Sequence, residues 1–186
     1  MERNDTVGQA DTVRLCSGSD VPVILRIINA AAEAYRGVIP ADRWHEPYMS
    51  LEELLSEVAA GVVFTGYAPD AELVGVMGIQ HVKNVRLIRH AYVTPDWQGH
   101  GVGSKLIANL HSRDEAPLLI GTWRAAGWAI RFYQRHGFAL VPDTAIAPLL
   151  KTYWNIPERQ VETSVVLASP VLSVSDAAQL IALSSA

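Results

Sequence analysis

The sequence predicts a single α+β domain built on a mostly antiparallel sheet. Three consecutive strand-like segments, 62–68, 73–82 and 85–93, are separated by the turn-forming pairs Pro69-Asp70 and Lys83-Asn84, a pattern typical of an antiparallel meander. After this meander, amphipathic helical segments alternate with short apolar strands, which indicates a mixed α/β arrangement. With 186 residues, the chain can bury one sizeable core and is too short to suggest two domains.

Two helices are expected before the meander. A short strand over 13–15 precedes a helix over 20–35, whose N-cap is Asp20. The second helix begins at the capping box Ser50-Leu51-Glu52-Glu53, continues with apolar residues at helical spacing, and ends near Gly61. The order up to the meander is therefore strand, helix, helix.

After the meander, the expected order is helix, strand, helix, strand, strand. The corresponding ranges are 102–111, 118–123, 126–136, 138–141 and 161–167. Three prolines between 142 and 157 predict irregular structure before the last strand.

The two ends of the chain are expected to lie outside the domain. Residues 1–12 are polar and are expected to form a flexible leader, and residues 13–167 form the domain. Residues 168–186 are mostly small and are expected to form a C-terminal tail with at most a weak helix over 177–183.

Composition excludes several functional classes. The net charge of −4 and the pI near 5.8 argue against a nucleic-acid binder. Cys16 is the only cysteine, so no internal disulfide can form, and the six histidines show no helical i, i+4 pair, so no metal is expected. The N-terminus is polar, and no apolar run reaches the roughly 18 residues that a membrane span needs. We therefore expect a cytoplasmic protein that does not act at a membrane.

A glycine-rich run, Gln98-Gly99-His100-Gly101-Val102-Gly103, leads from the third meander strand into a helix. Glycines allow a ligand to approach the backbone closely, and the first N–H groups of a helix have no partners within it. These dipoles point at whatever lies there, which favours a phosphate. The sequence therefore predicts a loop that binds a phosphorylated ligand, with a plain tight turn as the alternative.

Two other phosphate-binding loops match this run poorly. A P-loop ends in Gly-Lys-Ser/Thr, whereas this loop ends in Gly103-Ser104-Lys105. The dinucleotide-binding fingerprint has the spacing Gly-x-Gly-x-x-Gly within a parallel β-α-β unit. Here the spacing is Gly99-x-Gly101-x-Gly103, and the preceding strands are expected to be antiparallel.

Two sequence blocks resemble those of one enzyme family. The spacing Gln98-x-x-Gly101-x-Gly103, after a strand ending in Tyr92-Val93-Thr94-Pro95, resembles motif A of the GNAT superfamily of N-acetyltransferases. The block Ala129-Ile130-Arg131-Phe132-Tyr133-Gln134-Arg135-His136-Gly137-Phe138 resembles motif B, and the element order over 13–167 is similar to that of the family. The resemblance implies the GNAT fold: a central, mostly antiparallel twisted sheet of about six to seven strands, with helices on both faces and a splayed central strand pair.

The resemblance also implies a reaction and a cosubstrate. Family members transfer an acetyl group from acetyl-coenzyme A (acetyl-CoA) to an amine, here a primary amine of a small molecule or peptide, by direct attack in a ternary complex. The pantetheine arm lies between the splayed strands, which correspond to 91–93 and 118–123, and an N–H near Val93 would stabilise the oxyanion. The expected cofactor-binding residues are Tyr92, Val93, Gln98, Gly99, His100, Gly101, Val102, Gly103, Ser104, Ala129 and Phe132.

Tyr133 matches a tyrosine that family members often place near the coenzyme sulfur. A phenol of pKa about 10 can protonate a departing thiolate of pKa about 8.5, because this transfer is only slightly uphill. The alternative is that Tyr133 is a core residue. The family often has an asparagine seven residues before this tyrosine, where this chain has Ala126, so one side-chain hydrogen bond would be missing.

His90 is the main candidate for the general base. The glutamate of histone-acetylating relatives would fall at Leu87, whereas His90 lies on the same strand and titrates near neutrality. A strand bulge would decide its direction, so a packed or surface histidine stays open, as does a water chain without a dedicated base. Weaker candidates for the base are Glu33, His45, Glu46 and His81.

Acceptor recognition in the family usually comes from the first two helices and their connecting loop. The candidates from this region are Tyr35, Arg36, Trp44 and Tyr48. Arg89, on the strand 85–93, is a further candidate that could bind an acidic group of the acceptor. Clustered aromatics with few charges suit a small amine with an apolar part, although the same loop could simply cap the core. The polar segment 153–162 either lines the far side of the acceptor pocket or packs against a second copy in a homodimer.

Two other functions stay open at this point. A non-catalytic acyl-CoA sensor or assembly protein that keeps the fold is supported by Leu87 and Ala126, where the chain departs from the family. An unrelated phosphate-ligand module would share only the glycine loop. The sequence indicates the donor and does not identify the acceptor.

Overall fold

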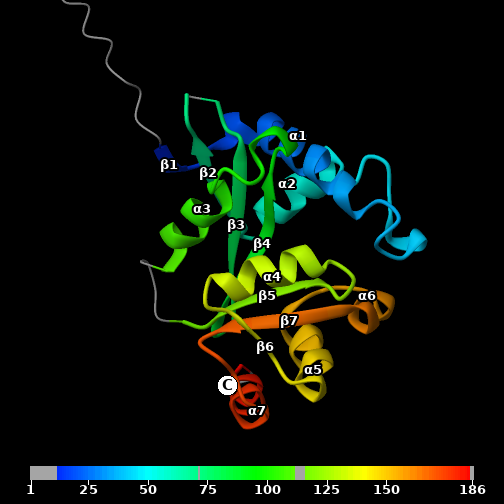
Figure 1. Ribbon diagram of the computed structural model, residues 1–186. Helices are drawn as coiled ribbons and strands as arrows, with labels where there is room; N and C mark the ends of the chain where they lie inside the picture. The colour runs from blue at the N-terminus through cyan, green and yellow to red at the C-terminus, as the bar shows by residue number, and fades with distance from the viewer. Residues whose placement is uncertain (1–11, 71, 112–115, 185–186) are drawn as a thin grey trace, which may run out of the picture.

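The computed structural model describes residues 12–70, 72–111 and 116–184, so the expected leader lies outside the described residues apart from Thr12. Within them the chain forms a seven-stranded sheet in the order β1-β2-β3-β4-β5-β7-β6 (Figure 1). The strands are β1 (Thr12–Leu15), β2 (Val63–Ala68), β3 (Gly75–Val82), β4 (Val85–Val93), β5 (Leu118–Trp123), β6 (Ala139–Leu140) and β7 (Ser164–Ser169). All neighbouring pairs are antiparallel except β4 and β5, which are parallel.

The parallel pair at the centre of the sheet is short. β4 and β5 are in register only from Arg86↔Leu118 to Ile88↔Ile120. Beyond these positions β4 continues to Val93 beside β3, and β5 continues to Trp123 beside β7. The two strands therefore separate at one end, and the predicted fold class with its splayed central pair is confirmed.

Helices cover both faces of the sheet (Figure 1). In the described part of the chain they are α1 (Val21–Ala32), α2 (Leu51–Ala59), α3 (Val102–His111), α4 (Gly127–Arg135), α5 (Asp143–Tyr153), α6 (Glu158–Thr163) and α7 (Val174–Leu183). Ile28 of α1 and Leu54 of α2 pack in one buried cluster with Val76 of β3. On the other side of β3, Val102 of α3 lies where a Cβ on Gly75 would meet it at 2.6 Å.

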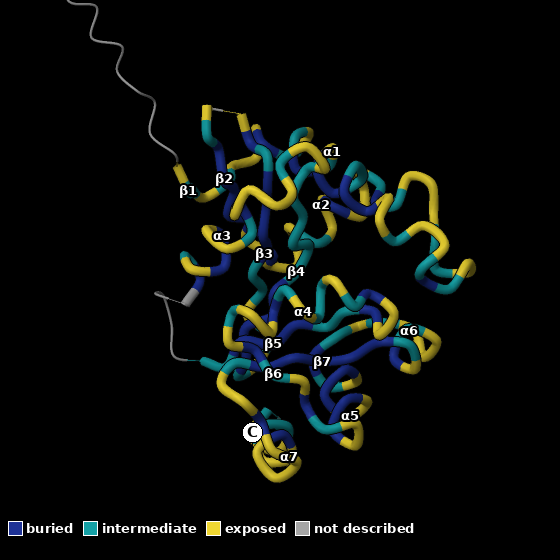
Figure 2. The backbone as a smooth tube through the Cα atoms, viewed as in Figure 1, coloured by how far each residue is buried: buried dark blue, intermediate teal, exposed yellow. Residues whose placement is uncertain are grey.

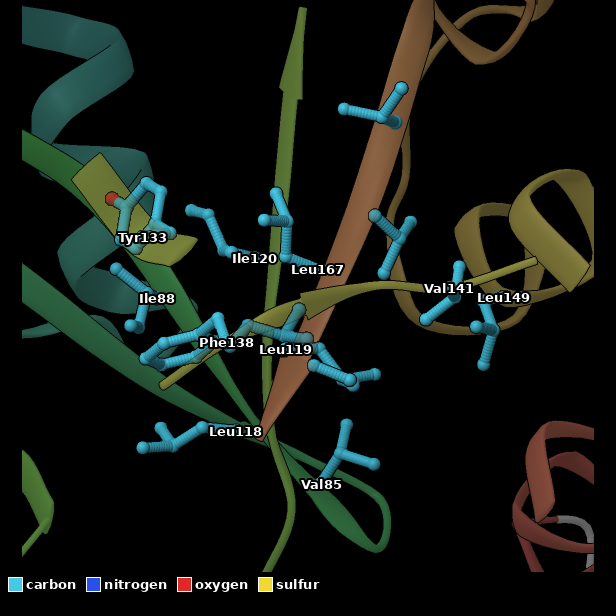
Figure 3. Packing of buried hydrophobic residues seen from close by; sticks show 14 of the residues in the cluster. Val85, Ile88, Leu118, Leu119, Ile120, Tyr133, Phe138, Val141, Leu149 and Leu167 are labelled. Carbon is cyan, nitrogen blue, oxygen red and sulfur yellow. The ribbon is translucent and has the colours of Figure 1, made fainter. Parts of the chain in front are cut away.

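The largest buried cluster surrounds β4, β5 and β7, and Figure 2 shows β7 almost entirely in the dark blue of buried residues. Leu87, Leu119 and Leu167 are fully buried on these strands. Figure 3 shows the ring of Tyr133 from α4 beside Ile88 and Ile120, the last pair before the strands separate. Apolar burial therefore holds α4 against the base of the splay.

The stretch between β6 and β7 is helical rather than irregular. Pro142 and Pro157 are the N-caps of α5 and α6, where a missing N–H costs nothing, so these prolines begin helices. Pro148 lies inside α5, and the burial of Leu149 and Leu150 stabilises that helix despite the lost hydrogen bond. The expected strand over 161–167 therefore begins later, at Ser164.

The segment that follows the expected domain continues the fold. Ala168 and Ser169 belong to β7 and pair with β5. α7 begins with a capping box formed by Ser173 and Asp176, and it is longer than the helix expected over 177–183. The hydroxyl of Tyr153 in α5 donates a hydrogen bond of 3.0 Å to the carbonyl of Leu180, which ties α7 to the domain.

In the parts of the chain that the structure describes, every helix is too short or too polar to cross a membrane.

Candidate active site

The glycine loop has two positions that favour glycine. Gly99 and Gly101 have φ angles of +80° and +77°, in the left-handed region that is costly for a residue with a Cβ. α3 begins at Val102, so the N–H groups of its first turn have no carbonyl partners within the helix. The loop therefore offers several backbone donors and the positive end of a helix dipole at one place.

α4 is fastened to this loop by His136, which follows its last turn. His136 Nδ1 lies 2.8 Å from the carbonyl oxygen of Phe132, which can only accept, so Nδ1 is the protonated nitrogen. In the neutral ring, Nε2 then accepts a hydrogen bond of 2.9 Å from the Ser104 hydroxyl in α3. The start of α3 and the end of α4 are thus held together.

β4 is bulged at the point where it leaves β5. Its register with β3 shifts between Val76 and Gly78, and His90 has a φ angle of +49°, which is uncommon for a residue other than glycine. The Thr94 N–H donates to the carbonyl of Val74 on the β3 side. Because N–H directions alternate along a strand, the N–H of Val93 faces the opposite side, toward the gap between β4 and β5.

The gap and the glycine loop open into one cavity of about 700 Å³. All the expected cofactor-binding residues except His100 line it: Tyr92, Val93, Gln98, Gly99, Gly101, Val102, Gly103, Ser104, Ala129 and Phe132. His100 instead lies on the outside of the loop, where its ring packs beside Trp97 with centroids 5.8 Å apart. The cavity therefore connects a phosphate cradle with a slot between two strands.

The central part of the chain matches a known family. Residues 61–140, from the end of α2 to β6, match the family model described as an acetyltransferase (GNAT) domain. This match identifies these 80 of the 186 residues as similar to GNAT acetyltransferases. No curated protein sequence matches it.

Solved structures of GNAT acetyltransferases share this fold. The PaiA N-acetyltransferase of Thermoplasma acidophilum, determined with coenzyme A, superposes with a TM-score of 0.64 at 16% identity, over 86% of this chain and 98% of its own. A GNAT-family acetyltransferase of Staphylococcus aureus Mu50 gives 0.63 at 16% identity, over 86% and 98%. The ribosomal-protein-S18-alanine N-acetyltransferase of Escherichia coli gives 0.60 at 17% identity, over 87% and 94%.

Tyr133 of this GNAT domain lines the cavity and is 5% exposed. Burial raises the pKa of its phenol well above the ordinary value of about 10, so the hydroxyl stays protonated at any physiological pH. Such a phenol is a weaker acid than a free tyrosine. A thiolate released into the same apolar cavity would be desolvated as well, however, which raises its own proton affinity.

Tyrosine side chains also line the part of the cavity next to α1. The rings of Tyr35 and Tyr48 are stacked with centroids 6.3 Å apart, and both contact the ring of Tyr92 edge-on. Burial raises the pKa of Tyr35 to about 12, against a smaller opposing effect of the Thr122 hydroxyl. Burial likewise raises the pKa of Tyr92. These hydroxyls are neutral hydrogen-bonding groups in an otherwise apolar wall.

Arg36 and Trp44, two of the expected acceptor-binding residues, do not line the cavity. The Arg36 guanidinium forms ion pairs with Glu33 at 2.8 Å and Glu46 at 3.1 Å, and lies 4.6 Å from the ring centre of Trp44. Trp44 itself packs against the small buried cluster that contains Ile39. The loop after α1 therefore supplies Tyr48 to the site, and its ion pairs involve two of the weaker base candidates.

His90 and Arg89 line the cavity at the bulge and share one partner. An Arg89 Nη2 atom lies 2.8 Å from the carboxylate of Glu57 in α2, and His90 Nε2 lies 3.3 Å from the same carboxylate. Arg89 also donates a hydrogen bond of 2.7 Å to the side-chain oxygen of Gln80. Because Arg89 is already paired, it is a poor partner for an acidic acceptor.

Several lining residues were not among the site residues expected from the sequence: Trp97, Thr122 and Trp128. Trp128 precedes Ala129 of motif B, so its place in the helix could have indicated it. Thr122 lies on β5 beyond Ile120, the last residue of β5 that pairs with β4, and so it faces the gap only because the parallel register is short. Trp154, Ile156 and Gln160 come from the segment 153–162, which thus lines the far side of the cavity.

Within the described residues, no group of three or more histidine, cysteine, aspartate or glutamate side chains is placed to hold a metal ion.

Proposed function

We propose that this protein transfers an acetyl group from acetyl-CoA to the primary amine of a small molecule or peptide, by direct attack in a ternary complex. The observation that carries this proposal is that the glycine loop and the splayed strands open into one continuous cavity. One end of that cavity suits a pyrophosphate and the middle suits an extended chain. The complex of the Thermoplasma relative with coenzyme A supports the same choice of donor.

The donor would be held by backbone more than by side chains. Residues 101–104, which form the end of the glycine loop and the first turn of α3, line the cavity and would offer their N–H groups to the pyrophosphate, and the N–H of Val93 faces the gap between the strands. When bound, acetyl-CoA supplies a thioester carbonyl that an amine can attack. An N–H donor at Val93 would then stabilise the negative charge that develops on the carbonyl oxygen.

Two side chains would move protons. The acceptor is an ammonium ion at neutral pH and must lose a proton before its nitrogen can attack, and His90 at the bulge is the candidate to receive it. Attack leaves the nitrogen of the tetrahedral species positively charged, and this nitrogen loses a second proton to solvent. Collapse then breaks the carbon–sulfur bond, and Tyr133 would give its proton to the leaving thiolate. Both groups return to their starting states by exchange with solvent.

The lining favours an acceptor with an apolar or aromatic body. The described lining residues include no aspartate or glutamate, and the arginine next to His90 is paired with Glu57. Tyr35, Tyr48 and Trp128 supply aromatic faces, which attract an ammonium group and pack against apolar carbon. A polyamine, which needs carboxylates, is a poor match.

A thiol-release assay with acetyl-CoA and a panel of arylalkyl, alkyl and acidic amines tests this function. We expect turnover with arylalkyl amines and a rise in melting temperature with acetyl-CoA alone. Stabilisation without turnover over the whole panel would favour the non-catalytic acyl-CoA sensor. That alternative is supported by Leu87 and Ala126, where the chain differs from the family pattern. Absence of any stabilisation would remove coenzyme A as the ligand.

A further inference from the structure

Glu57 lies behind the wall of the cavity and contacts the bulge from the α2 side. Its side chain is 27% exposed and that of His90 is 15% exposed. The Glu57 Oε2 and His90 Nε2 atoms are buried 3.3 Å apart, and no well-directed hydrogen bond joins them. Oε2 also lies 2.8 Å from an Arg89 Nη2 atom, so its charge is paired, whereas Nε2 has no well-directed partner. A buried ring nitrogen without a directed bond is costly, and a proton on Nε2 would let it donate to this carboxylate.

The bulge is what brings His90 to this carboxylate. Neighbouring side chains of a regular strand point to opposite faces, yet Arg89 and His90 both contact Glu57. The positive φ angle of His90 accompanies this change of direction and is strained for a residue other than glycine. The strain is thus stored at the residue that would receive the proton.

The ring of His90 is also oriented by apolar packing. Phe64 of β2 stacks on it with centroids 6.1 Å apart, so the ring plane is fixed. Nε2 is the nitrogen that faces Glu57, while Nδ1 is not among the buried unpaired atoms of the described residues. Since His90 lines the cavity, Nδ1 is the nitrogen left to meet a ligand.

We propose that Glu57 is the positioning residue for His90. Its carboxylate accepts a hydrogen bond from the Nε2–H group, which leaves Nδ1 to take the proton of the acceptor ammonium. The carboxylate then stabilises the imidazolium that results. The N–H bond of the ammonium breaks, an N–H bond forms at Nδ1, and the imidazolium later releases that proton to solvent. This inference rests on the proposed acetyl transfer for its catalytic part, whereas the pairing of the two side chains does not.

The charges around His90 fit this role. The charged groups that face His90 are Glu57 from α2 and Arg89 from β4. The neighbours from the other strands are neutral: Phe64 of β2 stacks on the ring, and Gln80 of β3 accepts a hydrogen bond from Arg89. Burial alone would raise the pKa of Glu57, but His90 and Arg89 outweigh burial and hold that pKa below its ordinary value. The carboxylate is therefore ionised at neutral pH and available to an imidazolium.

The pairing can be tested without any acceptor. Nitrogen-15 NMR of the full chain, with the His90 signal assigned by comparison with His90→Gln, reports which ring nitrogen carries the proton. We expect the Nε2–H tautomer in the wild type. In Glu57→Gln, where Arg89 remains and the carboxylate charge is gone, we expect a smaller share of the Nε2–H tautomer, because an amide oxygen is a weaker acceptor than a carboxylate. Glu57→Asp keeps the charge, so its share of the Nε2–H tautomer should lie between those of wild type and Glu57→Gln. Glu52→Gln, at an exposed site on the same helix, should leave the tautomer of His90 unchanged.

Activity then tests the catalytic part. With the best amine of the panel, Glu57→Gln should lower kcat by about 10- to 100-fold at constant KM, and should move the acid limb of the kcat/KM profile to lower pH. An unchanged tautomer, or a fall in melting temperature with an unchanged pH profile, would overturn the proposal. If no amine is turned over, acetyl transfer fails as the function, while the tautomer measured by NMR still decides whether Glu57 and His90 form a pair.

Discussion

Gly103 at the start of α3 lies against the ring of Phe132 in α4, so closely that a Cβ on Gly103 would meet two ring carbons at 3.0 Å. Its neighbour Gly101 is different, because a Cβ there would meet nothing within 4 Å, and glycine is favoured only by its φ angle. The two glycines of the motif therefore serve distinct purposes. One shapes the loop, and the other lets α4 close the cavity wall.

Gly103→Val should weaken acetyl-CoA binding by about tenfold or more, because the added side chain displaces Phe132 from the cavity wall. Titration calorimetry and the acetyl-CoA-dependent rise in melting temperature measure this effect. The fold should survive, since Phe132 is only partly buried and can move outward. The control is Gly18→Val, at a position distant in sequence from Gly103 where an added Cβ would meet no atom within 4 Å. An unaltered affinity in Gly103→Val would remove the start of α3 from the cofactor site.

Tyr133→Phe should lower kcat by about 10- to 100-fold while leaving the affinity for acetyl-CoA nearly unchanged, because it removes only the hydroxyl. Burial raises the pKa of Tyr133, so its deprotonation should produce no alkaline limb in the wild-type rate profile below about pH 10. Steady-state kinetics from pH 6 to 10, checked against Tyr153→Phe outside the cavity, measures both effects. A rate equal to wild type would make Tyr133 a core residue only.

The fold could be predicted largely because its signals are local. The meander, the glycine loop and the Gly-Phe after α4 are each encoded within a few neighbouring residues, and the strand over 85–93 matches β4 residue for residue. The helices α5 and α6 were missed because proline was taken as a breaker. Pro142 and Pro157 instead occupy N-caps, where local sequence alone does not separate a helix start from a loop.

The site was harder to predict because tertiary packing builds it. The glycine loop follows from spacing, but the direction of His90 depends on a bulge that no single-residue propensity encodes. Glu57 lies 33 positions before His90 on an amphipathic helix, where its charge was indistinguishable from those of solvated neighbours. Arg36 was a reasonable candidate for binding the acceptor substrate, but in the structure its guanidinium is paired with Glu33 and Glu46.

Asp20 should make stability depend on pH in the acid range. Hydrogen bonds from Arg14, at 2.8 and 2.9 Å, and from the N–H of Ser17 hold the pKa of Asp20 far below its ordinary value of about 3.9. A depressed folded-state pKa means that the stabilising effect is fully present above about pH 4 and is lost as pH falls toward the folded value. Because Arg14 is 38% exposed, solvent screening limits this effect to about 1–2 kcal/mol.

Urea unfolding of Asp20→Asn against wild type at pH 7 and pH 3 measures this contribution. The variant should be less stable by that amount at pH 7, and the difference should shrink at pH 3. Asp42→Asn at an exposed ion pair should show little difference at either pH. A gap between Asp20→Asn and wild type that is independent of pH would mean that lost packing, not charge, explains it.

Arg86→Met should destabilise the domain by about 2–3 kcal/mol, because one buried and one half-buried carbonyl group lose this donor. Arg86 is 5% exposed on β4, and its guanidinium donates hydrogen bonds of 3.2 Å to the carbonyl of Leu110 at the end of α3 and of 3.1 and 3.2 Å to that of Ala116 before β5. Methionine keeps the apolar stem but supplies no donor. Arg26→Met, at a side chain 61% exposed, changes the same residue type and should cost less than about 1 kcal/mol. Equal midpoints of chemical unfolding for the two variants would show that water replaces the Arg86 hydrogen bonds at no cost, and that β4, α3 and β5 are held in register by apolar packing alone.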